Sequence, residues 1–136
     1  MFVGSSSDES FRFQYGGVDV VTGGGGSDRF RIEYNESAWA RGDQPIHESS
    51  VYITDFSADD VLRFEEFGFN AQTFESEVSA YYDSPNDQTI ISVATNSVQE
   101  GRAEFVVDGE WLIGGSELRD FGDSRDKFVE LTLVSA

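Results

Sequence analysis

The stretch that decides the fold is Val18-Asp19-Val20-Val21-Thr22-Gly23-Gly24-Gly25-Gly26-Ser27-Asp28-Arg29-Phe30-Arg31. It holds two units nine residues apart, each an Asp followed two positions later by an apolar residue. Residues 23–31 match the repeat Gly-Gly-x-Gly-x-Asp-x-apolar-x, in which a glycine-rich turn precedes a short strand whose apolar side chain points inward. Glycines suit such a turn because they let backbone carbonyls converge where side chains would clash. The pattern therefore predicts a short parallel β-roll.

A weaker copy of this unit occupies residues 4–13, Gly-Ser-Ser-Ser-Asp-Glu-Ser-Phe-Arg-Phe. Aligning Phe11 with Phe30 places Glu9 opposite Asp28, nineteen residues apart. Successive turns of a β-roll fall on alternate sides, so turns about eighteen residues apart lie on the same side. We therefore expect the turn at 23–28 to stack on the turn at 4–9.

A more degenerate copy begins at Gly16 and ends at Asp19. Its turn falls on the opposite side of the roll, and its stacking partner is expected near residues 34–37, where Asn35 and Glu36 offer oxygens. Few clean copies are present, so we expect only one to about three cation sites.

The oxygens of these turns favour Ca²⁺, because carboxylates and carbonyls are hard ligands and the turns contain no imidazole or thiolate. A phosphate-binding loop would need a Lys-Ser/Thr pair or a helix directly after the glycines, and Arg29-Phe30-Arg31 is instead typical of a strand. A plain flexible loop would not explain the nine-residue spacing of the Asp residues. The expected ligands are the carbonyls of the glycine run and three carboxylates, namely Gly23, Gly24, Gly25, Gly26, Asp28, Asp19 and Glu9.

Residues 51–64 follow the repeats with a strand, an Ile-x-Asp-Phe corner, a short acidic turn and a second strand. Together with the glycine repeat, this resembles the RTX (hemolysin-type) family of secreted calcium-binding proteins. Residues 16–113 resemble the C-terminal roll-and-cap modules of serralysin-type proteases and of alginate epimerases. The resemblance implies that Asp55 and Asp60 are calcium ligands or turn formers. It covers the accessory module alone, since no protease zinc motif and no epimerase catalytic domain accompany it.

The remaining chain predicts an antiparallel cap. A short helix is expected near 73–80, capped by Asn70 or Thr73. Hairpins are expected for 78–83 with 89–94 and, around Asp108-Gly109, for 103–107 with 111–113; residues 35–50 are expected to form a long loop, and 128–134 a final strand. The predicted fold is therefore all-β, one domain over residues 1–136, with a degenerate roll at about 4–37 closed by a cap at about 51–136.

The composition excludes several classes of binding partner. Because 26 acidic and 9 basic residues give a formal net charge of −17, nucleic acid and anionic membrane surfaces would be repelled. There is no cysteine, which excludes disulfides and thiolate metal sites, and no apolar run approaches the length of a membrane span. Cations are the natural partners of such a chain.

The sequence predicts no catalytic centre. His47 is the only histidine, which excludes a multi-histidine zinc site and leaves a Ser-His-Asp triad without a supporting motif. Neighbouring carboxylates such as Asp59-Asp60 and Glu65-Glu66 have the residue types for glycoside hydrolysis, but chance pairs are common in so acidic a chain. We therefore expect a non-enzymatic protein.

The C-terminal region suggests how the protein reaches its compartment. Asp120, Asp123 and Asp126 precede the apolar stretch 128–134, an arrangement similar to the uncleaved signals of RTX proteins exported by type I machinery. An ordinary last strand would look the same. The preferred prediction is a secreted module that folds on binding Ca²⁺ and serves as a C-terminal cap with an export signal.

Two alternative functions stay open. The first is a calcium-dependent, self-assembling cell-surface or biofilm-matrix protein whose uncovered sheet edges pair with a neighbour. The second is a carbohydrate-binding module that stacks sugars on an aromatic platform made by Trp39, Tyr81, Tyr82 and Trp111.

Overall fold

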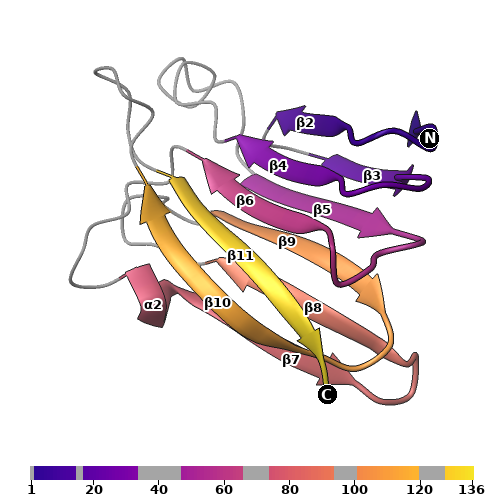
Figure 1. Ribbon diagram of the computed structural model, residues 1–136. Coiled ribbons are helices and arrows are strands. Elements are labelled where there is room, and N and C mark those ends of the chain that lie inside the picture. Colours follow the sequence, from indigo (N-terminus) through magenta and orange to yellow (C-terminus); the bar gives the residue numbers. More distant parts are fainter. Residues whose placement is uncertain (1, 15–16, 34–46, 66–73, 94–100, 120–127) are drawn as a thin grey trace.

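The computed structural model describes residues 2–14, 17–33, 47–65, 74–93, 101–119 and 128–136. Two sheets enclose one apolar core (Figure 1). The first sheet has the order β1 (Phe2–Val3), β3 (Gly17–Thr22), β5 (His47–Ile53), β9 (Gly101–Asp108), β8 (Gln88–Val93) and β7 (Val78–Asp83). The second has the order β10 (Trp111–Arg119), β11 (Phe128–Ser135), β6 (Val61–Glu65), β4 (Arg29–Glu33) and β2 (Ser10–Gln14).

Both sheets mix parallel and antiparallel pairing. In the first sheet β1, β3, β5 and β9 run parallel and β8 and β7 add antiparallel. In the second, β2, β4 and β6 run parallel and β11 and β10 add antiparallel. The predicted all-β class is confirmed. The expected layout of a parallel roll closed by a separate cap needs correction, because β9 and β11 join the parallel and antiparallel strands into two continuous mixed sheets.

Three turns carry the chain from the first sheet to the second. Turn 1 (residues 4–9) joins β1 to β2, turn 2 (residues 23–28) joins β3 to β4, and turn 3 (residues 54–60) joins β5 to β6. The parallel register places Phe11 opposite Phe30 and Phe30 opposite Leu62. The predicted alignment of Phe11 with Phe30 is therefore confirmed.

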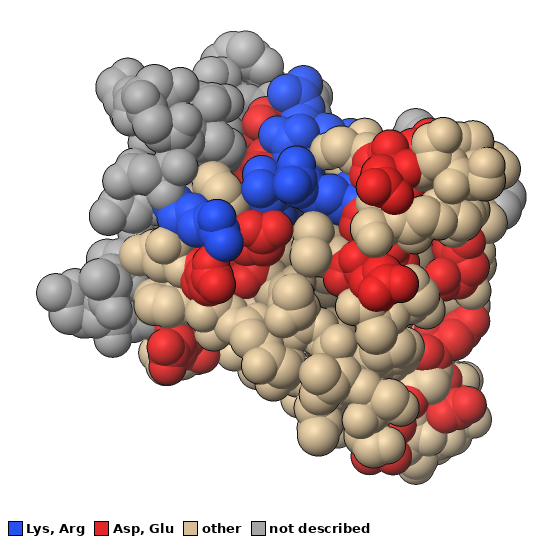
Figure 2. All heavy atoms as spheres, in the orientation of Figure 1, with Lys and Arg blue, Asp and Glu red and all other residues tan. Residues whose placement is uncertain are grey.

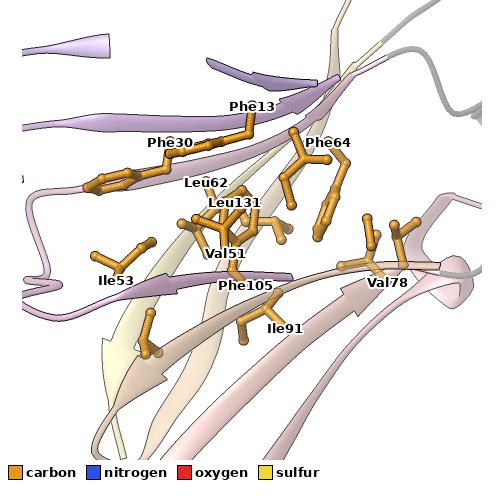
Figure 3. Close-up of a cluster of buried hydrophobic side chains, with 14 of the residues drawn as sticks. Phe13, Phe30, Val51, Ile53, Leu62, Phe64, Val78, Ile91, Phe105 and Leu131 are labelled. Atoms are coloured by element: carbon orange, nitrogen blue, oxygen red, sulfur yellow. The ribbon is translucent and has the colours of Figure 1, made fainter. Parts of the chain in front are cut away.

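Alternating apolar residues build the core from both sheets (Figure 3). On β4 and β6 every second side chain is buried, as the period of two in a strand requires. Phe64 of the second sheet contacts Phe105 of the first with ring centroids 5.2 Å apart, and Phe11 stacks on Phe30 at 5.4 Å. Because Phe11, Phe30 and Phe64 lie on the strands that follow turns 1, 2 and 3, their packing in the core holds the turns relative to one another.

The predicted hairpin of residues 78–83 with 89–94 is confirmed by β7 and β8. The second hairpin, around Asp108-Gly109, is wrong: β9 and β10 belong to different sheets. Both edges of β9 are already taken by β5 and β8, so β10 pairs with β11 instead. Gly109 adopts a φ of 89° at this corner, and the buried Thr89 hydroxyl donates to its carbonyl at 2.7 Å. The Asp-Gly signal thus marked a turn, but one between sheets.

Two boundaries differ from the expected ones. The strand β5 begins at His47, within the predicted loop 35–50, and residues 34–46 lie outside the described part. The predicted helix is present as α2 (Phe74–Glu77), after which the chain enters β7 at Val78; its suggested caps Asn70 and Thr73 also lie outside the described part. The predicted final strand is confirmed by β11.

Candidate metal centre

The three turns stack at one end of the molecule, on the right of Figure 1. The parallel hydrogen-bond ladder continues through them: Arg29 N donates to Glu9 O at 2.8 Å, and Val61 N donates to Asp28 O at 2.9 Å. On the other side of the turns, Gly4 N donates to Thr22 O at 2.7 Å. The predicted stacking of residues 23–28 on residues 4–9 is confirmed.

The carboxylates at the ends of turns 3 and 2 each bind the backbone of the preceding turn. Asp60 Oδ1 accepts from Asp28 N at 2.8 Å, and Asp28 Oδ1 accepts from Glu9 N at 3.0 Å. The Glu9 carboxylate instead turns back on its own turn, where Ser5 N and the Ser5 hydroxyl donate to Oε1. The series of carboxylate-to-backbone hydrogen bonds between turns therefore ends at turn 1.

A second set of carboxylates holds the glycine side of the stack. Asp55 accepts from Gly23 N and Gly24 N, both at 2.8 Å. Asp8 Oδ1 accepts from Ser27 N at 2.7 Å. Because glycine has no side chain, the amides of Gly23 and Gly24 can approach a carboxylate closely. In all, five acidic residues of the stacked turns lie in or around turn 2: Asp8, Glu9, Asp28, Asp55 and Asp60.

Asp28 is the least solvated of these acids, with an exposed fraction of 2%. Its Oδ2 is buried and accepts no hydrogen bond from the described residues. This oxygen faces the glycine side of its own turn, since a Cβ built on Gly23 would lie 2.5 Å from it. A buried carboxylate oxygen without a partner costs free energy, so this oxygen is a natural contact for a ligand from outside the chain.

The raised pKa values of two acids in the stacked turns also show that negative charge is unfavourable there. Burial raises the pKa of Asp28, and the nearby charges of Asp60, Glu9 and Asp55 raise it further against a backbone hydrogen bond that lowers it. Burial likewise raises the pKa of Asp60. Desolvation and like charges both disfavour the ionised forms, and a bound cation would reverse both effects.

The donor set fits a calcium ion better than a softer metal. It consists of carboxylate oxygens and of the turn carbonyls, the ligands that Ca²⁺ takes in flexible geometries. Among the described residues no three acidic or histidine side chains already converge on one point. Carbonyls must therefore complete any coordination sphere, which is the reason that a glycine-rich turn is chemically suitable.

Glycine is required at Gly24, where φ is 82° and a Cβ would overlap Ser5 O of turn 1. At Gly25 no positive φ occurs, and a Cβ would lie 3.3 Å from Ser6 Cα. Gly24→Ala is therefore expected to lower the free energy of unfolding by about 2–4 kcal/mol, from left-handed strain and the clash, and Gly25→Ala by under about 1 kcal/mol. Urea denaturation of both variants measures the difference. Equal losses would contradict the close stacking of turns 1 and 2.

The predicted site residues fall into two groups. The structure brings Gly23, Gly24, Gly25, Gly26, Asp28, Glu9, Asp55 and Asp60 together in the stacked turns. Asp19 is not among them: it lies inside β3, opposite Val51 of β5, because the β-branched residues around it extend the strand through it. The expected stacking partner of its turn, residues 34–37, lies outside the described part.

Sequence reasoning missed Asp8, which binds the backbone of turn 2. The signal was present, because Asp8 lies in the weak repeat beside Glu9 and at the same nineteen-residue distance from Ser27. The repeat pattern predicted Glu9 instead, because Glu9 aligns with Asp28 of the clean repeat.

Of the residues expected in the aromatic platform, Tyr81 and Tyr82 lie on β7 and Trp111 begins β10. Tyr81 is exposed on β7, while the Tyr82 hydroxyl donates to Asp87 at 2.7 Å. Trp111 packs edge to face on Phe56 with ring centroids 5.1 Å apart. Trp39 lies outside the described part.

No protein-family profile matches this sequence, and no curated protein is significantly similar to it. Within the described residues, no helix has the length and apolar character needed to cross a membrane.

Proposed function

We propose that this chain is a non-enzymatic calcium-binding module of the RTX (hemolysin-type) kind, in which the three stacked turns hold the ions and the two mixed sheets support the turns. The observation that carries the proposal is Asp28, whose buried Oδ2 lacks a hydrogen-bond partner within a glycine turn surrounded by acids. A hard cation is the ligand that satisfies this oxygen and offsets the surrounding negative charge.

The ions would be held between adjacent turns. No more than two of the carboxylates of Asp28, Asp55 and Asp60 would bind one ion between turns 2 and 3, and Glu9 would contribute one carboxylate between turns 1 and 2. The carbonyls of residues 23–26 would complete both sites. The positive charge of the bound ion offsets the repulsion between the carboxylates of the stacked turns. Because the ion binds the folded turns and not the unfolded chain, its binding free energy adds to the free energy of folding.

As a module of this kind, the protein would act outside the cell, where free calcium is in the millimolar range that weak extracellular sites need. Export by a type I signal near the C-terminus is part of the proposal. The acidic part of that signal, residues 120–126, lies outside the described part, and the apolar part forms β11.

A calcium titration tests the function. Circular dichroism, calorimetry and light scattering on the same sample should show saturable binding, a gain of β-structure or thermal stability, and a constant monomeric mass. If calcium neither binds nor changes the stability, the proposal is wrong.

A second candidate function is calcium-dependent self-assembly. It is favoured by β1 and β2, which are edge strands of the two sheets among the described residues, and by Val3 of β1, which is exposed. Particles that grow in mass on adding calcium, and dissolve with a chelator, would select this function over a monomeric cap.

A further inference from the structure

The outer faces of the two sheets present different chemistry to the solvent. On the second sheet, Arg12, Arg31 and Arg63 lie in one row across β2, β4 and β6, and charged side chains gather on this face (Figure 2). The arginines pair with acids beside them, since Glu65 lies 2.7 Å from Arg31 and 3.7 Å from Arg63. Polar and charged side chains are the ordinary covering of a sheet face that meets water. The first sheet has a different outer face.

Apolar and aromatic side chains form a continuous row across the outer face of the first sheet. The residues adjacent to them on the strands, such as Val21 and Ile91, are buried, so the alternation of a strand points this row away from the core. None of its members is buried, and Tyr81 has an exposed fraction of 66%. This apolar strip takes one residue from each of five paired strands, β3, β5, β9, β8 and β7: Val20, Tyr52, Val106, Ile90 and Tyr81.

Polar side chains border the apolar strip on both sides. The Tyr52 hydroxyl donates to the two carboxylate oxygens of Asp108 at 2.9 and 3.0 Å. Because Asp108 lies two positions beyond Val106 on β9, the Tyr52 ring is held along the sheet surface. The row on one side of the strip consists of Ser50, Glu104, Ser92 and Ser79, and the row on the other side consists of Asp108, Gln88 and Asp83.

The apolar strip is too narrow for a protein partner. With strands about 4.8 Å apart and rows about 7 Å apart, it is about 19 Å long and about 7 Å wide. A stable protein–protein interface covers about 800 Å² on each partner, which is several times the area of the strip. A second copy of this chain would also bring a surface with the same acids, Glu104 and Asp108, against this one at a net charge of −17. The shape and the charge therefore favour a thin, uncharged ligand.

We propose that the apolar strip binds an uncharged, extended polysaccharide that lies across the strands. A pyranose ring has apolar faces of C–H groups and an edge of hydroxyl groups. Its faces would stack on Tyr52 and Tyr81, and its hydroxyls would bond to the serines and carboxylates of the bordering rows. A polyanionic chain would be repelled by the same carboxylates.

The polysaccharide site is separate from the candidate metal centre, because the apolar strip contains no residue of turns 1, 2 or 3. It also differs from the aromatic platform predicted from the sequence, with which it shares only Tyr81. The proposal therefore does not depend on the calcium assignment.

Isothermal titration calorimetry of the full chain in calcium-containing buffer tests the site. The probes are cellohexaose, mannohexaose and xylohexaose, whose β-1,4 linkages keep the chain extended, and hexagalacturonic acid is the charged comparison. Saturable binding of at least one uncharged probe is expected, without binding of the acid. In amide spectra of the ¹⁵N-labelled protein, the shifts should map to β5, β9, β8 and β7. If none of the three uncharged probes binds, or if the shifts map elsewhere, the proposal is wrong.

Matched variants locate the stacking contact. Tyr81→Ala is expected to weaken binding about tenfold, because an aromatic contact is lost. Tyr81→Phe keeps the ring and should bind within about twofold of the wild type. Leu112→Ala removes an exposed apolar side chain from the second sheet and should leave the affinity unchanged. Equal affinities of Tyr81→Ala and Leu112→Ala would overturn the proposal, as would light scattering that shows a dimer lost in Tyr81→Ala, since a second copy would then occupy the strip.

Discussion

Asp28→Asn is expected to abolish most of the stabilisation by calcium and to make the calcium-free protein more stable at neutral pH. In the wild type, one site at a hundredfold excess of calcium over its dissociation constant adds about 2.7 kcal/mol, or about 10 °C in the melting temperature. The amide retains an oxygen that can accept from Glu9 N but carries no charge to bind the ion. It also removes a buried carboxylate that burial and three neighbouring acids disfavour.

The pH dependence gives this prediction a definite sign. The pKa of Asp28 is raised in the folded state, so the folded protein holds this proton more tightly than the unfolded chain. The associated stability is complete below the unfolded pKa and is lost as the pH rises through the folded pKa. Without calcium, the wild type should therefore lose stability as the pH rises from the ordinary aspartate pKa through the raised pKa of Asp28, and Asp28→Asn should lose less.

Differential scanning calorimetry in calcium and in chelator, over that pH range, measures both effects. Asp19→Asn is the matched control, because it removes the same charge from the body of β3. Its calcium-induced shift should equal that of the wild type. An Asp28→Asn protein that keeps the full shift would remove Asp28 from the ligand set.

Glu65→Ala is the second large effect, with an expected loss of about 3–5 kcal/mol in the free energy of unfolding. Glu65 is fully buried, binds Arg31 through both oxygens and lies 3.7 Å from Arg63. Removing it leaves two partly buried guanidinium groups with one fewer anion, beside Arg29. Such a loss is a large fraction of the total stability of a domain of this size.

Chemical denaturation of Glu65→Ala and of Glu117→Ala tests this account. Glu117 is exposed and pairs only with the exposed Arg119 among the described residues, so its removal should cost under about 1 kcal/mol. If the two variants lose equal stability, the buried pair of Glu65 and Arg31 contributes no more than a surface pair, and the prediction for Glu65 is wrong.

Much of the stacked-turn arrangement of the candidate metal centre was predictable because it depends on local spacing. The glycines and Asp28 lie within one repeat, and the alignment of Phe11 with Phe30 alone predicted which turn stacks on which. Asp55 and Asp60 followed from resemblance rather than spacing, because turn 3 carries no glycine run. Asp19 was misplaced because two residues of the repeat pattern are too few to tell a turn from a strand.

Other features depend on which strands pair with one another, and the sequence pattern of a single segment does not determine that pairing. The Asp108-Gly109 turn has the same chemistry whether it closes a hairpin or joins two sheets. The arginine row arises only when Arg12, Arg31 and Arg63 come into register from segments far apart in the chain. Read singly, each of these arginines is an ordinary polar residue on the outer face of an alternating strand.

The strand order of the first sheet also has a consequence for folding kinetics. Strands β7, β8 and β9 are neighbours in sequence and pair antiparallel, whereas β5 pairs with β9 across a longer stretch of chain, and β3 and β1 are joined to β9 only through β5. Pairings between near neighbours close smaller loops and form faster. The antiparallel meander should therefore form first and serve as a template for the parallel strands. In native-state hydrogen exchange, amide protection should then fall progressively from β9 through β5 and β3 to β1.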